Sequence, residues 1–259
     1  SFQIPVHWHD EFEIIYVRSG FLAVSISGES YIGKTGDAFV VSPGNLHLMG
    51  SQTGTVDYYT FLFPLKYISF RTDDMLDEKL LEPLNSGHLM ICPRVKDTAK
   101  ELCEQLIEIY EAKKDESESK ITTQVRTKII LLQFILEMWK KGFVIENDTS
   151  GRNTVEKEMV SYIQQNFTGK ISLREFGEQF HLSEKYISRY FKEHFHITLS
   201  QYVTYLRLEH AKQLLQDTDI PVTDVAMQSG YQNVSYFIRS FQKAYAVSPL
   251  KYRKNNYSR

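Results

Sequence analysis

The sequence predicts a two-domain protein in which an all-β barrel or jelly roll with two appended helices precedes an all-α domain. Three observations support this prediction. One helix-turn-helix pattern occurs twice in the last hundred residues, short β-rich runs fill the first seventy, and the charge changes sign between the halves. Residues 1–151 hold 15 Lys and Arg against 22 Asp and Glu (net −7), whereas residues 152–259 hold 15 against 10 (net +5). This asymmetry is typical of a sensor attached to a polyanion-binding domain.

The front domain begins with β-rich runs that are separated by Gly, Ser and Pro turn signals. The predicted strands are 13–17, 21–26, 38–41 and 58–63. Short strands at this spacing favour a small barrel or jelly roll. Residues 71–96 show no clear pattern.

Two helices are predicted to complete the front domain, at about 97–113 and 119–141. Asp97 is a candidate N-cap for the first. The second carries apolar residues at helical spacing, namely Ile121, Val125, Ile129, Leu132, Leu136 and Trp139. We interpret this stripe as a dimer contact, with packing on its own domain as the alternative. The front domain is therefore assigned to residues 1–141, and the polar stretch 142–153 to a linker.

The back domain, residues 154–259, contains the two helix-turn-helix units. Ser172 and Glu175 predict a capping box at the start of the first unit, and Gly177 supplies a small residue where two helices approach closely. A continuous helix is expected to hold the two units rigidly apart. The predicted helices are 154–167, a first short helix after Ser172, 184–194, 199–215, 222–228 and 233–244.

The outward faces of the two recognition helices carry the candidate DNA contacts. These are Lys185, Ser188, Arg189 and Lys192 on the first, and Val234, Ser235, Ile238, Arg239 and Lys243 on the second. Arg189 or Arg239 can bond guanine O6 and N7 together, whereas lysines suit phosphates. One surface arginine alone is commonly just solvated, but the equivalent placement of the pair favours base contact. Recognition helices about 34 Å apart would enter two successive major grooves of double-stranded DNA.

The stretch from Asp224 to Arg253 contains Val-Ala, Gly-Tyr, Ser-Tyr-Phe, Phe-Gln-Lys and Ser-Pro-Leu-Lys-Tyr-Arg. With this stretch, residues 154–254 resemble the DNA-binding domain of the AraC/XylS family of bacterial transcription regulators. The resemblance implies base contacts at Lys185, Ser188, Arg189, Val234, Ser235, Ile238 and Arg239. The chain departs from the family pattern at His196, Tyr231, Gln242 and Ala246; His196 and Ala246 stand where Gly is common after each recognition helix.

The front domain resembles a cupin. His7, His9, Glu13 and Gly20 are similar to the first cupin motif, and Gly36, Pro43, Gly44 and His47 to the second. In cupin enzymes the corresponding set, here His7, His9, Glu13 and His47, binds a metal. We interpret these four residues instead as hydrogen-bonding groups that bind a small-molecule effector, without metal or other cofactor. Residues 7, 9 and 13 share one parity, so one strand would present them to the barrel interior.

The sequence therefore predicts a ligand-responsive regulator of carbohydrate or other small-metabolite genes, and not an enzyme. By the resemblance, a sugar is the commonest type of effector. Expected partners are double-stranded DNA, the effector, a second copy of the chain, and RNA polymerase if the protein is an activator. Two alternatives stay open: a metal-dependent cupin enzyme or metal sensor fused to a DNA-binding domain, and a constitutive binder whose front domain only dimerises.

The remaining sequence features concern location. No run of 18 apolar residues occurs, so no membrane span is expected. Cys92 and Cys103 lie outside any metal-like spacing, and two free thiols fit a reducing cytoplasm. The chain starts at Ser1 without an initiator Met and without the layout of a signal peptide, so we expect an N-terminal piece to precede it.

Overall fold

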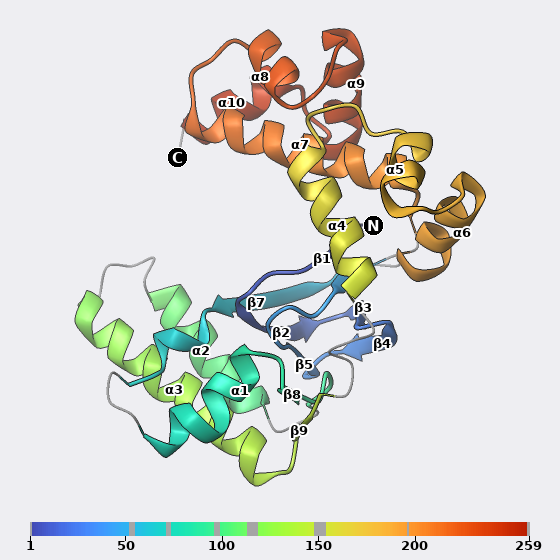
Figure 1. The fold of residues 1–259 in the computed structure, drawn as a ribbon. Coiled ribbons are helices and arrows are strands. Elements are labelled where there is room, and N and C mark those ends of the chain that lie inside the picture. Colours follow the sequence, from blue (N-terminus) through green and yellow to red (C-terminus); the bar gives the residue numbers. More distant parts are fainter. Residues whose placement is uncertain are drawn as a thin grey trace. The chain divides into compact units, whose positions relative to one another are not determined.

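The computed structural model describes residues 2–51, 55–70, 74–95, 99–112, 119–147, 154–195 and 197–257. The chain divides into two compact units, Ser1–Lys157 and Glu158–Arg259 (Figure 1). Each unit has its own clusters of buried apolar side chains. The predicted fold class, a β-rich front domain followed by helices and then a helical domain with two helix-turn-helix units, is confirmed. None of the described helices is both long and apolar enough to cross a membrane.

The front unit contains two antiparallel sheets, with strand orders β1-β6-β3-β4 and β5-β2-β7. Their strands are β1 Phe2–His7, β2 Phe12–Ser19, β3 Phe21–Ile26, β4 Glu29–Lys34, β5 Ala38–Val41, β6 His47–Ser51 and β7 Asp57–Phe63. The four predicted strands correspond to β2, β3, β5 and β7. Sequence patterning missed the others because β1 contains Pro5, β6 is short and contains Gly50, and the edge strand β4 is mostly polar.

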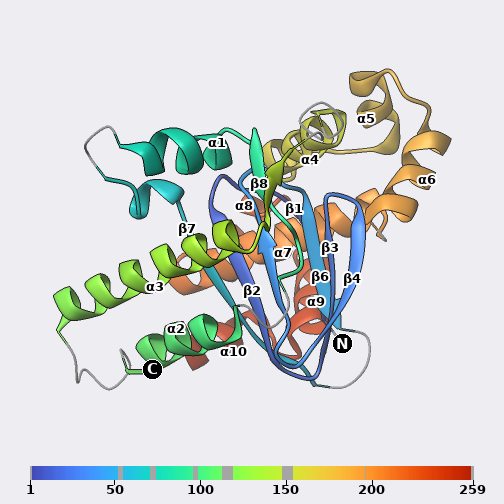
Figure 2. The same cartoon turned by 90° about the horizontal axis from the view of Figure 1, so that it is seen from below.

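Strand β2 is buried on both faces, and this explains its nearly continuous apolar run. Ile15 and Val17 lie in a cluster with Leu22 and Met49 of the other sheet, so they fill the space between the sheets. Their neighbour Ile14 faces the opposite way and packs among helical residues. The front unit therefore has three layers, which are two sheets and a group of helices (Figures 1 and 2).

The helical layer of the front unit follows β7. It comprises the 3-10 turn Leu65–Tyr67, the π-helical turn Asp77–Leu81, α1 Glu82–Asn85, α2 Lys100–Ala112 and α3 Lys120–Lys140. The two long helices agree with the predicted ranges, and Ser119 caps α3 by accepting a hydrogen bond from the Thr122 amide. Asp97, the predicted N-cap of α2, lies outside the described residues.

The segment predicted as a linker is partly a strand. β9, Val144–Glu146, pairs with β8, Leu89–Ile91, in a two-stranded antiparallel sheet. The amide of Cys92 also donates to the Phe143 carbonyl at 2.9 Å. The polar residues that suggested a linker begin only at Glu146, and the apolar Val144 and Ile145 before them form an edge strand that returns the chain to its own domain after α3. Residues 148–153 lie outside the described residues.

The second unit is entirely helical among the residues described. The helices are α4 Thr154–Asn166, which enters this unit at Glu158, followed by α5 Leu173–Phe180, α6 Glu184–Phe195, α7 Leu199–Asp217, α8 Val222–Gln228, α9 Val234–Tyr245 and α10 Pro249–Tyr257. The sequence patterning did not predict α10. On α4, Val155 was expected to face inward but is 54% exposed, whereas Val160 is fully buried.

The two helix-turn-helix units repeat the same packing. The capping box of Ser172 and Glu175 is present at the start of α5. A side chain at Gly177 would place its Cβ 2.5 Å from the Leu182 carbonyl oxygen, so only glycine allows this close approach. In both turns one residue adopts a left-handed conformation: His181 (φ 55°) in the first and Gly230 (φ 84°) in the second.

Candidate functional site

The first recognition helix, α6, is oriented by its buried face. Ser183 caps it by accepting a hydrogen bond from the Tyr186 amide at 3.2 Å. Ile187 and Phe191 are fully buried. At 100° per residue, the opposite face then carries the predicted contacts. Lys185, Arg189 and Lys192 are exposed, and Ser188 is half-buried.

The second recognition helix, α9, repeats this arrangement with one difference. Asn233 caps it, and Phe237 and Phe241 are fully buried. Ser235, Arg239 and Lys243 are exposed as predicted. Val234 and Ile238, which were predicted to point outward, are half-buried and pack against the core of this unit, because both lie at the edge of the apolar face.

Equivalent positions of the two helices carry the same residue types. Arg189 and Arg239 each follow their N-cap by six residues. Arg189 lies 4.0 Å from Glu193 and 5.8 Å from the centre of the Tyr186 ring. Tyr186 and Tyr236 each follow the N-cap by three residues and are 39% and 53% exposed. These two tyrosines were not among the candidate contacts predicted from the sequence, although their identical spacing in both copies can be seen there.

The four residues predicted to bind the effector lie together in the front unit. The Nε2 atoms of His9 and His47 lie 3.1 Å and 3.0 Å from the same Glu13 oxygen, and one ring nitrogen from each of His7, His9 and His47 lies within 4.8 Å of the others. The predicted reason for this grouping was wrong. His7 ends β1, His9 follows it, and Glu13 and His47 belong to two further strands, so two sheets and not one strand bring the set together.

Each of the three imidazoles is held by its other ring nitrogen. The Nδ1 atoms of His7, His9 and His47 lie 2.9–3.0 Å from the carbonyl oxygens of Pro5, Glu11 and Asn45. A carbonyl oxygen can only accept a hydrogen bond, so Nδ1 carries a proton in each ring. A neutral ring then presents an unprotonated Nε2 to the cluster, whereas His9 needs a second proton on Nε2 to donate to the ionised Glu13 carboxylate. The Nε2 of His47 is buried 3.0 Å from the same carboxylate but outside hydrogen-bond geometry.

The environment sets the charge of these groups in opposite directions. Burial and the neighbouring His47 lower the pKa of His7 to about 4, so this ring is neutral near pH 7. Burial acts to raise the pKa of Glu13, but its contacts with His47 and His9 outweigh burial and lower it to about 2. Burial also opposes protonation of His9, yet the bond to Glu13 leaves its pKa above the ordinary value.

The size of the cluster decides what it can hold. The ring centroids are 4.0–5.8 Å apart, so the space between the imidazoles accepts an ion or a water-sized group and not a sugar ring. Nitrogen ligands of a tetrahedral zinc ion, at about 2.0–2.1 Å from the metal, lie roughly 3.3 Å apart. One nitrogen from each of the three imidazoles lies within 4.8 Å of the others, and the Glu13 oxygen lies beside two of these rings. Nitrogen and carboxylate ligands of this kind suit a divalent transition metal.

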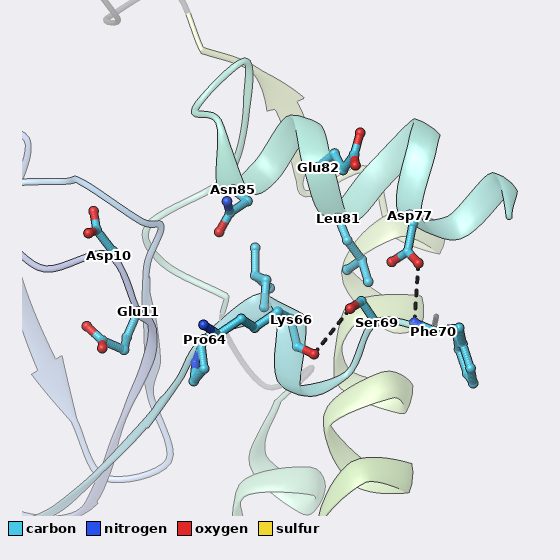
Figure 3. A pocket seen from close by; sticks show the side chains of 11 residues that line it. Asp10, Glu11, Pro64, Lys66, Ser69, Phe70, Asp77, Leu81, Glu82 and Asn85 are labelled. Carbon is cyan, nitrogen blue, oxygen red and sulfur yellow. Dashed lines mark hydrogen bonds between the residues drawn. The ribbon is translucent and has the colours of Figure 1, made fainter. Parts of the chain in front are cut away.

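A larger cavity of about 830 Å³ lies elsewhere in the front unit (Figure 3). Its lining is rich in carboxylates, including Asp10, Glu11, Asp77 and Glu82, with Lys66 and Asn85 beside them. Asp77 accepts a hydrogen bond from the Phe70 amide through one oxygen, and its other oxygen is buried without a partner among the described residues. The cavity is large enough for a metabolite, but its lining includes none of the four predicted effector-binding residues.

The apolar stripe of α3 faces away from the core of its own unit. Ile130, Leu131, Phe134, Ile135 and Met138 are buried, whereas the stripe residues Ile121, Val125, Ile129, Leu136 and Trp139 are 47–75% exposed. At 100° per residue, these five fall within an arc of about 80° opposite the buried face. The alternative of packing on the same domain therefore holds only for Leu132, which is half-buried against that core.

Comparison with known proteins agrees with both units. Residues 1–135 match the model of the AraC-like ligand binding domain, and residues 176–255 match a helix-turn-helix domain. The chain is 30% identical to an uncharacterized HTH-type transcriptional regulator, YdeC, of Bacillus subtilis, over 98% of this chain and 87% of the relative. It is 24% identical to the melibiose operon regulatory protein of Escherichia coli K12, over 96% and 83%.

A solved structure extends the likeness across the whole fold. A single-residue variant of apo ToxT from Vibrio cholerae superposes with a TM-score of 0.52 over 97% of this chain and 92% of ToxT, at 14% identity, which shows a shared fold alone. The ligand-binding domain match covers more than half of the chain, and the YdeC similarity spans nearly all of it. The chain thus belongs to the AraC family of transcriptional regulators, with an AraC-like ligand-binding domain and a helix-turn-helix DNA-binding domain.

Proposed function

We propose that this protein is a ligand-responsive regulator that reads an asymmetric DNA site with α6 and α9 in two successive major grooves. The main support is the repeated geometry of the second unit, in which capped helices with buried aromatic faces leave Arg189 and Arg239 exposed at equivalent positions. The effector would act by favouring one arrangement of the chain over another. Its place of action would be the cytoplasm, and an activator would also contact RNA polymerase.

Substitution of the two arginines is expected to relax specificity at different base pairs. Arg189→Ala and Arg239→Ala should each lose about 1–3 kcal/mol of discrimination at one position, because a bidentate contact to guanine is lost. The measurement is the affinity for duplexes selected from a random library with the purified protein and then changed one base pair at a time. Lys192→Ala is the matched control. It should weaken binding evenly across sequences, and an unchanged base preference in Arg189→Ala would contradict our placement of α6.

The effector is proposed to be a small metabolite, of which a sugar is the first candidate. A relative at 24% identity is named for the melibiose operon, and another, from Enterobacter, is the transcriptional activator RhaS. Carboxylate, amide and hydroxyl groups line the 830 Å³ cavity and can bond several sugar hydroxyls. His7, His9, Glu13 and His47, the predicted effector-binding residues, are proposed to take a smaller ligand.

A divalent transition metal ion is the second candidate ligand, and the grouping of three imidazoles, two of which contact the buried Glu13, favours it. His7, His9, Glu13 and His47 would hold the ion, and they would do so in a regulator, since the relatives point away from an enzyme. Because a ligand that binds only the folded state stabilises it, a metal at 100 times its Kd should add about 2.7 kcal/mol of stability.

Thermal unfolding of the front unit separates the two ligand classes. Both tryptophans, Trp8 and Trp139, lie in this unit, so tryptophan fluorescence reports its melting alone. A melting temperature that rises with one sugar, and does so equally in the presence of a chelator, supports a metabolite sensor. A melting temperature that falls with a chelator and recovers with one metal supports the ion. This response should be absent in Glu13→Gln but present in the exposed control His88→Ala. Unchanged operator affinity and transcription with bound ligand would contradict the regulator proposal.

The protein is also proposed to act as a homodimer through the exposed stripe of α3. Ile129→Glu should shift the chain from dimer to monomer, because a carboxylate buried in an apolar interface loses its hydration. Light scattering coupled to size-exclusion chromatography gives the mass. Gln124→Glu adds the same charge at an exposed polar position of α3 and should stay dimeric. A dimer that survives Ile129→Glu and Val125→Glu together would exclude this face.

A further inference from the structure

The connecting helix α7 divides its buried residues between the two helix-turn-helix units. Near its start, Tyr202 is fully buried, and its hydroxyl lies beside Gln164 of α4. Further along, Leu208, Ala211 and Leu215 belong to the core cluster of the second helix-turn-helix unit. A helix of 19 residues alone would permit bending and small rotations between the two recognition helices.

Arg207 lies where α7 passes from one core to the other. Its Nε donates to the Phe167 carbonyl and its Nη2 to the Gly169 carbonyl, both at 2.7 Å. These carbonyls belong to the loop between α4 and α5, on the side of the first unit. The same guanidinium lies 5.8 Å from the centre of the Tyr231 ring, which is buried in the core of the second helix-turn-helix unit. Arg207 therefore contacts both the loop that precedes the first helix-turn-helix unit and the core of the second.

The turn of the second helix-turn-helix unit contacts the same loop. At Gly230 a Cβ would lie 2.6 Å from the Thr168 carbonyl oxygen and 2.8 Å from its Cα, so the two backbones are in direct contact. The Phe167 ring also packs edge-on against His210 of α7, with centroids 5.5 Å apart. The short loop 167–169 is thus held between α7 and the turn of the second helix-turn-helix unit.

We propose that Arg207 is a positioning residue for DNA reading, which fixes the distance and rotation between α6 and α9 by clamping loop 167–169. The inference rests on the proposed reading of two grooves by one chain. Two charge-assisted bonds from a planar guanidinium to two carbonyls fix an orientation that a lysine ammonium cannot reproduce. Arg207 need not touch DNA for this role, since it determines which spacing between the two DNA segments contacted by α6 and α9 allows both helices to bind.

The clamp predicts a specific loss of spacing discrimination. The probes are a duplex selected from a random library by the intact protein, the same duplex with one base pair inserted between the two contacted segments, and duplexes with either segment scrambled. For the unaltered chain we expect the insertion to weaken binding at least about 10-fold. In Arg207→Lys and Arg207→Gln, affinity for the selected duplex should fall about 10-fold and the insertion should cost less than about 3-fold.

The controls separate positioning from simple destabilisation. Arg174→Gln removes an exposed arginine of α5 whose contact is an ion pair with Glu178, and it should keep the full spacing penalty. Binding of the Arg207 variants to duplexes with one scrambled segment should equal that of the unaltered chain, which also shows that each recognition helix is folded. The inference is overturned if Arg207→Lys keeps the full loss of affinity on the insertion. It is also overturned if the affinity of this variant for duplexes with one scrambled segment falls as much as its affinity for the selected duplex. If the unaltered chain selects no duplex with two contacted segments, the proposed two-groove reading fails instead.

Discussion

Replacement of Phe237 by alanine is expected to destabilise the second helix-turn-helix unit by about 3–5 kcal/mol. The side chain is fully buried, and its ring lies 5.2 Å from Tyr231 and 5.7 Å from Phe241, centre to centre. Truncation removes these contacts and leaves a cavity that rigid helices cannot close. The measurement is urea unfolding followed by far-ultraviolet circular dichroism, which reports the helices, beside tryptophan fluorescence, which reports the front unit.

The adjacent residue provides the control for this variant. Tyr236 is 53% exposed, so Tyr236→Ala should change the free energy of unfolding by less than about 1 kcal/mol. It should weaken DNA binding instead, because it is exposed beside Ser235 on the proposed recognition helix. Equal stability losses in the two variants would mean that the buried and exposed faces of α9 are assigned wrongly.

Gly230→Ala is expected to cost about 3 kcal/mol or more. An alanine at φ 84° is strained by about 1–2 kcal/mol, and its Cβ would also lie 2.6 Å from the Thr168 carbonyl oxygen. Backbone cannot move aside as a flexible side chain can, so α8 and the turn must shift. The same circular dichroism measurement gives the loss, and tryptophan fluorescence should be unchanged.

Ala246→Gly is the matched control with the opposite sign. Ala246 ends α9 in a left-handed conformation (φ 60°), where Gly is common in the family. Relief of strain, reduced by the greater freedom of glycine in the unfolded chain, should stabilise this unit by about 0.5–1 kcal/mol. A stabilising Gly230→Ala, or a destabilising Ala246→Gly of similar size, would contradict the backbone geometry of both turns.

The helical unit was largely predictable because its signals are local. Capping side chains, the 3.6-residue period and a small residue at Gly177 each act within a few positions along the chain. They placed α5 through α9 and the faces that carry Arg189 and Arg239. Errors arose at the edges of apolar faces, where Val234 and Ile238 proved half-buried and Val155 exposed. There the period alone does not determine which neighbour covers a side chain.

The front unit was less predictable because its order comes from pairing between distant strands. β1, β4 and β6 contain Pro, Gly or exposed polar residues, and they become strands through partners elsewhere in the chain. β9 is short and next to a polar stretch, so it was included in the predicted linker, and its pairing with the distant β8 is what makes it a strand. The 830 Å³ cavity escaped notice because its lining comes from segments as far apart as Asp10 and Asn85.

By itself, then, the sequence determined the two-domain order, the repeated recognition helices and the identity of the four residues in the imidazole cluster. Only the tertiary structure decided that this cluster is ion-sized, that the α3 stripe is left exposed by its own unit, and that Arg207 and Gly230 grip one loop. The physical reason is distance along the chain. Periodicity and capping depend on neighbours within about four residues, whereas a cavity, an exposed face or a clamp depends on which remote segments pack against one another.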